Sequence, residues 1–386
     1  MTRQPCADNV RTRVRVLAIL CGALGTLPAA AIADPVLQSF PAPIGFTSGV
    51  QVSGMSGDGT TLVGTLFRPG LFTAFRWTSA GGVEDLGPLP GGAPPNYSEA
   101  YGASFDGSGV VGWGYDANSN GAAARWSGGT VQQVGAAISY ARAISADGQV
   151  AVGGFGNYLG SGEAHACRFQ TGAPLIPLAE LTGALTSQAN SVSHDGAVIV
   201  GSSDSSDGYR AVRWTASGVQ SLGVLTGGSS SVAYVVSGDG STVFGASDIG
   251  DGFAGPAFRW TEAGGMEDIG VIAGMDSAQP TSASADGSSL VGYGYHSVTG
   301  EEAPMLWTST LGMMNLRVYL AAIAVDLAGW QNLYVTGISA DGTVLGGGGV
   351  FNGESRGWIV SGVPAPASIS VLLLGAAFAP RRRRGA

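Results

Sequence analysis

Seven aspartates at a regular interval are the residues of this sequence whose type and spacing most suggest chemistry. They are Asp58, Asp106, Asp147, Asp195, Asp239, Asp286 and Asp341, and the intervals between them are 48, 41, 48, 44, 47 and 55 residues. Each is followed by Gly, has a Ser two positions before it and has a second Gly six positions after it. A ring of seven acids would suit metal binding or acid–base chemistry. However, Asp-Gly also suits a two-residue hairpin loop with both residues at positive φ, stiffened by Ser and Asp side chains. Recurrence in every repeat favours this structural role.

The residues around these turns predict four short strands in each repeat. In the stretch 231–270 the predicted strands are 232–237, 242–245, 257–261 and 266–270, separated by segments rich in Gly and Asp. Short runs of β-branched and aromatic residues bounded in this way are typical of strands. A unit of 41–55 residues with four strands is typical of a propeller blade.

The two ends of the repeat region indicate how the array finishes. Residues 36–40 match the fourth strands of the repeats, such as 219–222, whereas the last repeat stops after its third strand, 357–360. If the first strand completes the last blade, no sheet edge is left open. We therefore expect an all-β fold, a seven-bladed β-propeller closed by its N-terminal strand. A six- or eight-bladed ring and an open β-solenoid remain the alternatives.

An insertion in the last repeat, 315–333, carries Leu316, Leu320, Ile323 and Leu327 at spacings of 4, 3 and 4. This spacing predicts a short amphipathic helix.

The repeat motifs resemble those of the HAF family of extracellular repeats. The resemblance rests on Ala74-Phe75-Arg76-Trp77, on Glu84 to Gly87 and on Val110 to Gly112, and it covers roughly residues 50–360. It implies an extracellular repeat fold and supplies no catalytic mechanism.

The N-terminal 33 residues are typical of a secretory signal peptide. Arg3, Arg11, Arg13 and Arg15 precede an apolar run over 16–27, and Ala31-Ile32-Ala33 forms an A-x-A site that predicts cleavage before Asp34. The domain prediction is therefore a signal peptide over 1–33, a propeller over 34–362 and a sorting segment over 363–386.

The C-terminal segment 363–386 has three parts in a fixed order. Val363-Pro364-Ala365-Pro366 is followed by an apolar run over 367–379, and the run by Arg381, Arg382, Arg383 and Arg384. The apolar run has 13 residues, shorter than the roughly 20 that a spanning helix needs. The segment resembles the PEP-CTERM sorting signal, with Ala365 where that motif has Glu. The resemblance implies membrane association before processing and an exosortase-type processing enzyme as a partner.

Composition excludes two classes of protein. The chain has 65 Gly but is 45% hydrophobic, which excludes a disordered chain. Between the terminal segments ten Arg face 26 acidic residues, a net charge of 10 − 26 = −16, which argues against nucleic-acid binding. The one cysteine outside the leader, Cys167, predicts a small buried side chain.

Other candidate groups are few. His165, His194 and His296 have no metal-ligand companions at short spacing. Arginines recur at one position of the third strand, at Arg76, Arg125, Arg168, Arg213 and Arg259. Such a column could hold a carboxylate or sulfate, but its repetition favours a structural role, such as ion pairs to the Asp-Gly turns.

One loop resembles a calcium site. Asp116, Asn118 and Asn120 have the D-x-N-x-N-G spacing, although Ser127 stands where the twelfth-position acid is expected. Calcium is therefore the single cofactor considered, and an ordinary polar turn is the preferred interpretation.

These observations favour a secreted, surface-sorted propeller with a binding or structural role in the cell envelope or extracellular matrix of a Gram-negative-type bacterium. No catalytic residue is predicted, and extracellular polysaccharide is one candidate ligand. The alternative is an extracellular hydrolase or lyase acting on polysaccharide, which would need an acidic pair in the central funnel.

Overall fold

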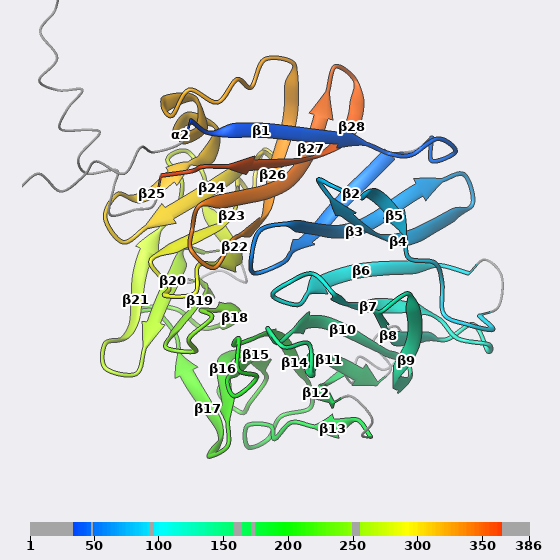
Figure 1. Cartoon of the computed structure of the whole chain (residues 1–386). Helices are drawn as coiled ribbons and strands as arrows, with labels where there is room; N and C mark the ends of the chain where they lie inside the picture. Colours follow the sequence, from blue (N-terminus) through cyan, green and yellow to red (C-terminus); the bar gives the residue numbers. More distant parts are fainter. Residues whose placement is uncertain are drawn as a thin grey trace, which may run out of the picture. The chain divides into compact units, whose positions relative to one another are not determined.

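The computed structural model describes residues 34–47, 49–92, 96–156, 164–170, 174–248 and 255–364, which form seven four-stranded antiparallel sheets arranged as a ring (Figure 1). The prediction of an all-β, seven-bladed propeller is confirmed, and the six-bladed, eight-bladed and open-solenoid alternatives are wrong. The predicted cleavage site at Ala31 and Ala33 lies outside the described residues. So do the tail residues Ala365, Pro366, Arg381, Arg382, Arg383 and Arg384.

Each blade runs from an innermost first strand to an outermost fourth strand. The first strands are β2 (Gly49–Met55), β6 (Ser98–Ala103), β10 (Ser139–Ile144), β14 (Ser187–Val192), β18 (Ser231–Val236), β22 (Ser277–Ala283) and β26 (Trp330–Ile338). The second strands are β3 (Thr61–Arg68), β7 (Gly109–Tyr115), β11 (Val150–Gly156), β15 (Ile199–Ser203), β19 (Thr242–Ser247), β23 (Ser289–Tyr295) and β27 (Val344–Phe351). The third strands are β4 (Leu71–Thr78), β8 (Gly121–Ser127), β12 (Ala164–Gln170), β16 (Arg210–Thr215), β20 (Ala257–Thr261), β24 (Glu302–Thr308) and β28 (Glu354–Ser361). The fourth strands are β5 (Gly82–Asp85), β9 (Thr130–Ala137), β13 (Ile176–Pro177), β17 (Gly218–Gly223), β21 (Gly265–Gly270), β25 (Gly312–Asn315) and β1 (Val36–Pro41).

The ring closes between the two ends of the chain, as predicted. Strand β1 pairs antiparallel with β28, with Phe40 opposite Gly357, so the blade that begins at β26 receives its fourth strand from the N-terminus (Figure 1). Phe40 is buried and stacks on Trp77 of the first blade, with ring centroids 4.5 Å apart. A Cβ at position 357 would lie 2.1 Å from the Phe40 ring, so only Gly fits opposite it.

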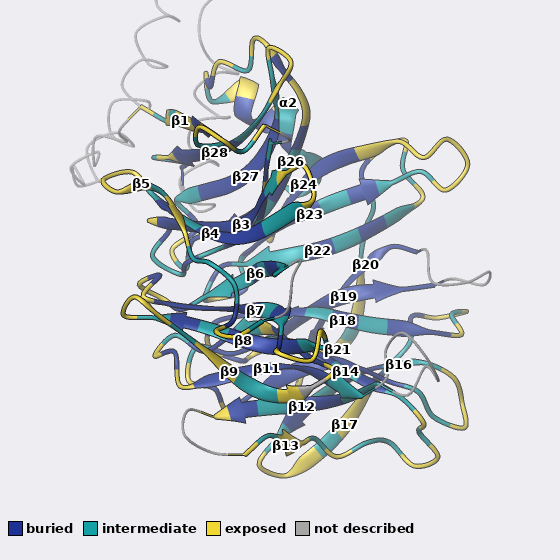
Figure 2. Ribbon diagram, turned by 90° about the vertical axis from the view of Figure 1, so that its right-hand side faces the viewer, coloured by how far each residue is buried: buried dark blue, intermediate teal, exposed yellow. Residues whose placement is uncertain are grey.

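Most residues of the third strands are buried or intermediate (Figure 2), and their aromatic side chains belong to hydrophobic clusters that combine residues of neighbouring blades. The buried members of this column are Trp77, Trp126, Phe169, Trp214, Trp260 and Trp307. The indole nitrogen of Trp126 donates to the carbonyl of Gly87, at the end of the preceding blade, over 3.1 Å. Each repeat therefore buries its apolar face only against its neighbours, which is the physical reason for a closed array.

The inserted segment of the last repeat forms helix α2 (Leu316–Ala322), as the leucine spacing predicts. The Asn315 side chain caps its first turn by accepting from the Arg317 N–H, and Leu316 and Leu320 are fully buried. Within the described ranges, no helix combines the length and apolarity needed to span a bilayer.

Candidate functional site

The seven Asp-Gly turns have one shared geometry, which differs from the predicted two-residue loop. In the fourth blade, Ser193 and Val198 form the closing backbone pair, so the loop between them has four residues, 194–197. The Gly196 N–H donates to the Ser193 carbonyl at 3.0 Å, and Gly196 has a φ of 72°. Asp195 is not among the residues with positive φ. The two-residue prediction is wrong because a type I turn followed by a left-handed Gly places Asp-Gly one step later in a longer loop.

The turn aspartates are occupied by hydrogen bonds within their own loops. Asp195 Oδ1 accepts from the Ser193 hydroxyl at 2.6 Å and from the Ala197 N–H at 3.0 Å. These bonds stabilise the carboxylate, so the Ser193 hydroxyl, with the Ala197 N–H, lowers the pKa of Asp195. The same Ser–Asp bond is present in all seven turns, and each Ser is buried.

Backbone hydrogen bonds also join each turn to the next. The donors and acceptors are Asp58 to Phe105, Phe105 to Ala146, Ala146 to His194, His194 to Gly238, Asp239 to Ala285, Ala285 to Ala340 and Ala340 to Gly57. The last of these bonds, 2.7 Å long, returns to the first blade, so the seven form a closed circuit. We call this circuit the turn ring. It fastens one end of all seven innermost strands, which gives the aspartates a scaffolding role.

A second ring of seven residues results from a bulge in every first strand. Each first strand has a register shift at an equivalent residue, and β26 has a second shift between Gln331 and Tyr334. The equivalent bulge residues are Ser53, Tyr101, Arg142, Asn190, Tyr234, Thr281 and Thr336. We call them the bulge ring. Each stands five positions before the Asp of its turn.

The bulge explains the second recurring Gly of each repeat. In the third blade a Cβ at Gly153 would lie 2.0 Å from the carbonyl oxygen of Tyr140, on the bulged strand. The corresponding distances in the seven blades are 1.8 to 2.1 Å. No side chain fits there, so this Gly allows the first strand to bulge and to turn one extra residue toward the axis.

The bulge ring lines a central cavity of about 190 Å³. The cavity reaches the turn ring at Phe105 and His194, whose rings meet edge to face at 5.8 Å. Among the described residues that line it, Arg142 alone carries a permanent charge, and none is Asp or Glu. Typical pockets for drug-sized molecules enclose about 300–1,000 Å³, so this cavity suits a smaller ligand.

Arg142 is held by a relay that crosses two blade boundaries. Its Nη1 donates to Asn190 Oδ1 at 3.0 Å, and Asn190 Nδ2 donates to the carbonyl of Ala233 at 2.8 Å. The amide of Asn190 is thereby fixed by the fifth blade and orients the guanidinium from the third. Arg142 forms none of the ion pairs found among the described residues, and its side chain is exposed.

The two tyrosines of the bulge ring have different surroundings. The Tyr101 hydroxyl donates to Glu99 at 2.6 Å and accepts from the Trp113 indole at 2.7 Å, so it is already satisfied. Burial and the Glu99 carboxylate raise the pKa of Tyr101. Burial raises the pKa of Tyr234 to about 12, which keeps its hydroxyl protonated at neutral pH.

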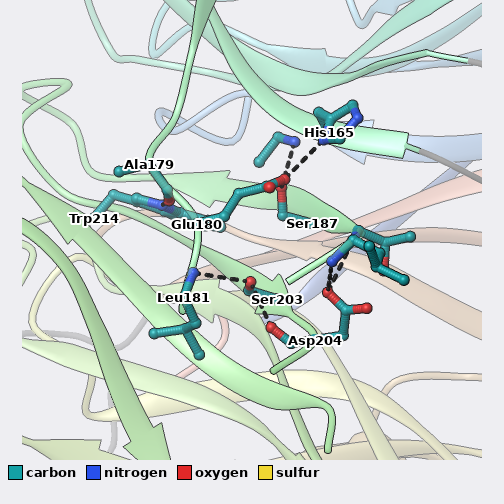
Figure 3. A network of polar contacts seen from close by, with 11 residues as sticks. His165, Ala179, Glu180, Leu181, Ser187, Ser203, Asp204 and Trp214 are labelled. Carbon is teal, nitrogen blue, oxygen red and sulfur yellow. Dashed lines mark hydrogen bonds and ion pairs between the residues drawn. The ribbon is translucent and has the colours of Figure 1, made fainter. Parts of the chain in front are cut away.

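The three histidines do not come together. His165 pairs with Glu180 at 2.9 Å, and the Ser187 hydroxyl donates to the same carboxylate at 2.6 Å, which fastens the third blade to the fourth (Figure 3). His296 lies 3.5 Å from Asp276, and His194 lies in the turn ring. In the part of the chain that the structure describes, no three His, Cys, Asp or Glu side chains gather in a metal-binding group.

The arginine column forms pairs within and between blades. Arg76 binds Glu84 at 2.6 Å, and its Nη1 lies 3.4 Å from the carbonyl of Gly107 in the next blade's Asp-Gly turn. Arg213 and Arg259 lie 3.8 and 3.9 Å from Glu262 and Glu267, respectively. Arg76, Arg213 and Arg259 therefore contact glutamates and a turn carbonyl in place of the predicted turn aspartates. Arg125 does interact with a turn aspartate, because the Ser145 hydroxyl and, to a smaller extent, the Arg125 charge lower the pKa of Asp147 in the next blade.

The calcium-like loop is explained by its own hydrogen bonds. Asp116 Oδ1 accepts from the N–H groups of Asn118 and Asn120 at 2.8 and 2.9 Å, and the Asp116 N–H donates to the Asn120 carbonyl. This is the arrangement of an ordinary polar turn. Cys167 is buried, and burial raises the pKa of its thiol.

Sequence reasoning missed the bulge ring. Its seven members share no residue type, so motif comparison passes over them. The sequence marks these residues only by their position. Each lies five residues before a turn Asp, on the strand that pairs with the strand of the second Gly. The side chains that vary between repeats at that position are those that line the cavity.

Comparison with known proteins bears on the fold alone. No protein-family model and no curated protein matches the sequence. A structure from a study of two prolyl endopeptidases is similar with a TM-score of 0.52 at 14% identity, covering 93% of this chain and 56% of that chain. The structure of an oligogalacturonate lyase from Vibrio parahaemolyticus is similar with a TM-score of 0.51 at 10% identity. The similarity covers 86% of this chain and 98% of the lyase chain. The structure of TolB from Acinetobacter baumannii has a TM-score of 0.47 at 12% identity. The similarity covers 66% of this chain and 62% of the TolB chain, so this chain spans about three-fifths of the length of TolB. The chain is a seven-bladed β-propeller with a polar axial cavity.

Proposed function

We propose that this chain is a secreted, surface-retained propeller of the HAF type whose central cavity binds a ligand in the cell envelope or extracellular matrix. Support for the binding role comes from the bulge ring. Seven equivalent bulges place side chains of five residue types around one space. A purely structural device would be expected to repeat its side chains, as the Ser and the Asp of the turn ring do.

The alternative of an extracellular polysaccharide hydrolase or lyase lacks its key requirement in the described cavity. A glycosidase-type mechanism needs two carboxyl groups about 5–10 Å apart on either side of the bond to be cut. The described cavity lining contains Arg142 and His194 but no carboxylate, and Glu99 is engaged by Tyr101 and Trp113. Propeller enzymes of similar fold do not transfer their activity, because function resides in the site and not in the scaffold.

The binding role is tested on the full chain with a glycan and small-metabolite panel, comparing it with a blocked variant. Ser53→Trp places an indole at a bulge position that lines the cavity. Gln132→Trp, on exposed strand β9, is the matched control. We expect ligand binding to be lost in Ser53→Trp and kept in Gln132→Trp. Equal binding by both variants would exclude the cavity as the site.

Secretion and retention are proposed from the leader and the C-terminal segment, with an exosortase-type enzyme as the processing partner. Val363 is buried in the core of the last blade, and its N–H donates to the Thr343 carbonyl at 2.9 Å. A truncation must therefore start after Pro364. Deletion of 365–386 should release folded protein into the culture medium, measured by fractionation and immunoblotting. Unchanged association with cells would contradict the anchoring role of the tail.

A further inference from the structure

We propose that the central cavity binds a small polyhydroxylated carboxylate, the chemistry of a sugar acid, through the Arg142 guanidinium. This inference rests on the proposed binding function and assigns its ligand class.

Arg142 is placed as a binding group and not as a structural one. Arginines Arg76, Arg213 and Arg259 of the third strands have carboxylate partners within the protein. Arg142 has none among the described residues, and its Nη1 donates a hydrogen bond to Asn190. A guanidinium has five N–H donors in a planar fork that matches a carboxylate, and Arg142 lines the cavity.

The guanidinium is also held in place before any ligand arrives. Asn190 is fixed by its bond to the Ala233 carbonyl, and the Arg142 guanidinium lies 5.9 Å from the centre of the Tyr140 ring. An oriented fork loses less side-chain entropy on binding than a free one. The Arg142 charge also reaches both tyrosines of the bulge ring, where it opposes the rise in the pKa of Tyr101 and Tyr234.

The other side of the cavity offers hydroxyl groups. Ser53, Thr281 and Thr336 belong to the bulge ring in the first, sixth and seventh blades. The Thr281 hydroxyl lies within 3.4 Å of two backbone carbonyls, which take its proton and leave its lone pairs as acceptors. These residues are short, so they leave room opposite the larger side chains of the second to fifth blades. A ligand with a carboxylate for Arg142 and O–H donors for the Ser and Thr hydroxyls would match both sides of the cavity.

Size and charge limit the ligand further. A cavity of about 190 Å³ is smaller than a typical pocket for a drug-sized molecule, so it suits a ligand of about one sugar unit. The body of the protein carries 10 Arg against 26 acidic residues, so a long polyanion is repelled, whereas a single carboxylate is attracted locally by Arg142.

The test is to titrate the full chain separately with sodium D-glucuronate, D-glucose and sodium acetate and to measure binding by calorimetry or ligand-observed NMR. Glucose lacks the carboxylate and acetate lacks the hydroxyls, so we expect each to bind at least about tenfold more weakly than glucuronate. Arg142→Gln should weaken glucuronate binding by about tenfold or more, because a charge-assisted bidentate contact is lost. The glucuronate affinity of Arg142→Lys should lie between those of Arg142→Gln and the wild type. Arg76→Gln should bind glucuronate as tightly as the wild type does.

Each result decides the inference. Glucuronate binding by Arg142→Gln at wild-type strength, or glucose binding as tightly as glucuronate, would overturn it. Absence of glucuronate binding at millimolar concentration would overturn it as well. If a neutral ligand binds and Ser53→Trp abolishes that binding, the cavity function stands and only the ligand class fails. Thermal unfolding of each variant verifies the fold, and Arg142→Lys provides a conservative replacement should Arg142→Gln unfold.

Discussion

The turn ring and the bulge ring lie on the same seven strands but use the repeat in opposite ways. In the turn ring the same pair of side chains recurs in every blade, a buried Ser bound to an Asp at 2.6 to 2.9 Å. In the bulge ring the backbone is the same in every blade, and the side chains range from Ser and Thr to Tyr and Arg. One ring repeats its chemistry and the other repeats only its geometry.

This difference separates scaffold from site within a single repeat. In the turn ring, hydrogen bonds within each loop hold the Asp side chain through its Oδ1 atom. The bulge ring needs a recurring Gly on the neighbouring strand, but it places no demand on its own side chain. Substitutions should therefore cost most stability where the geometry of the bulge is forced, less at a turn, and least at the bulge residues themselves.

The Gly opposite a bulge should show the largest effect. Gly153→Ala places a methyl 2.0 Å from the Tyr140 carbonyl, so the bulge or the strand must shift. We expect the free energy of unfolding to fall by about 3 kcal/mol or more, measured by urea denaturation. In the control, Gly121→Ala on β8, the new methyl would lie 3.6 Å from the Trp113 ring, an ordinary contact. Equal stability of the two variants would show that the bulge does not require Gly.

A turn Ser should come next. Ser193→Ala removes the hydroxyl that donates to Asp195 and accepts from the Val198 N–H, leaving a buried donor unpaired. The expected loss is about 1–3 kcal/mol in the same measurement. The comparison is Ser53→Ala in the bulge ring, where we expect a change within about 0.5 kcal/mol. A larger loss at Ser53 than at Ser193 would reverse the assignment of scaffold and site.

The turn aspartates predict how stability depends on pH. The Ser145 hydroxyl and the Gln149 N–H lower the pKa of Asp147, and the pKa of five of the other six turn aspartates is also lowered. A carboxyl group with a lowered pKa in the folded state contributes its full stabilisation above the unfolded value of about 4 and loses it as pH falls through the folded value. Urea midpoints should therefore decrease as pH falls below about 4.

Asp147→Asn checks the origin of this dependence. The amide cannot ionise, so the variant should be somewhat less stable than the wild type at pH 7, and the difference should shrink in acid. A constant difference across the acid range would show that the Asp147 charge does not contribute.

Much of the fold was predictable because it depends on features that recur. The period of the Asp-Gly pairs predicts the blade count, and the position of Phe40 before the first repeat predicts the closure. The loop length was not predictable from Asp-Gly alone, because that dipeptide serves both two-residue and four-residue turns. Register was also hidden in the last blade. Trp358 is the same residue type as the Trp of the third-strand motif. However, it pairs with Gly347, as Phe75 pairs with Gly64 in the first blade, so it takes the position of the Phe and not of the Trp.

The site was not predictable because its members differ from blade to blade. Arg142, Asn190 and Tyr234 occupy one structural position but share no chemistry, so no motif connects them. The bulge that makes them equivalent is a property of paired backbones. It appears in the sequence only through the space that Gly153 and its counterparts leave on the adjacent strand.

The smallest expected change in stability is at Arg142, and it tests whether the bulge ring is free of a structural role. Arg142→Gln removes an exposed side chain that donates a hydrogen bond to Asn190, so the free energy of unfolding should stay within about 0.5 kcal/mol of the wild type. Arg76→Gln, which breaks an exposed pair with Glu84, should lose a similarly small amount. The two variants then differ only in ligand binding, which Arg142→Gln loses and Arg76→Gln keeps. A loss of more than about 2 kcal/mol in Arg142→Gln would mean that the bulge ring also holds the blades together, and the division between a repeated scaffold and a varied site would fail at its most important residue.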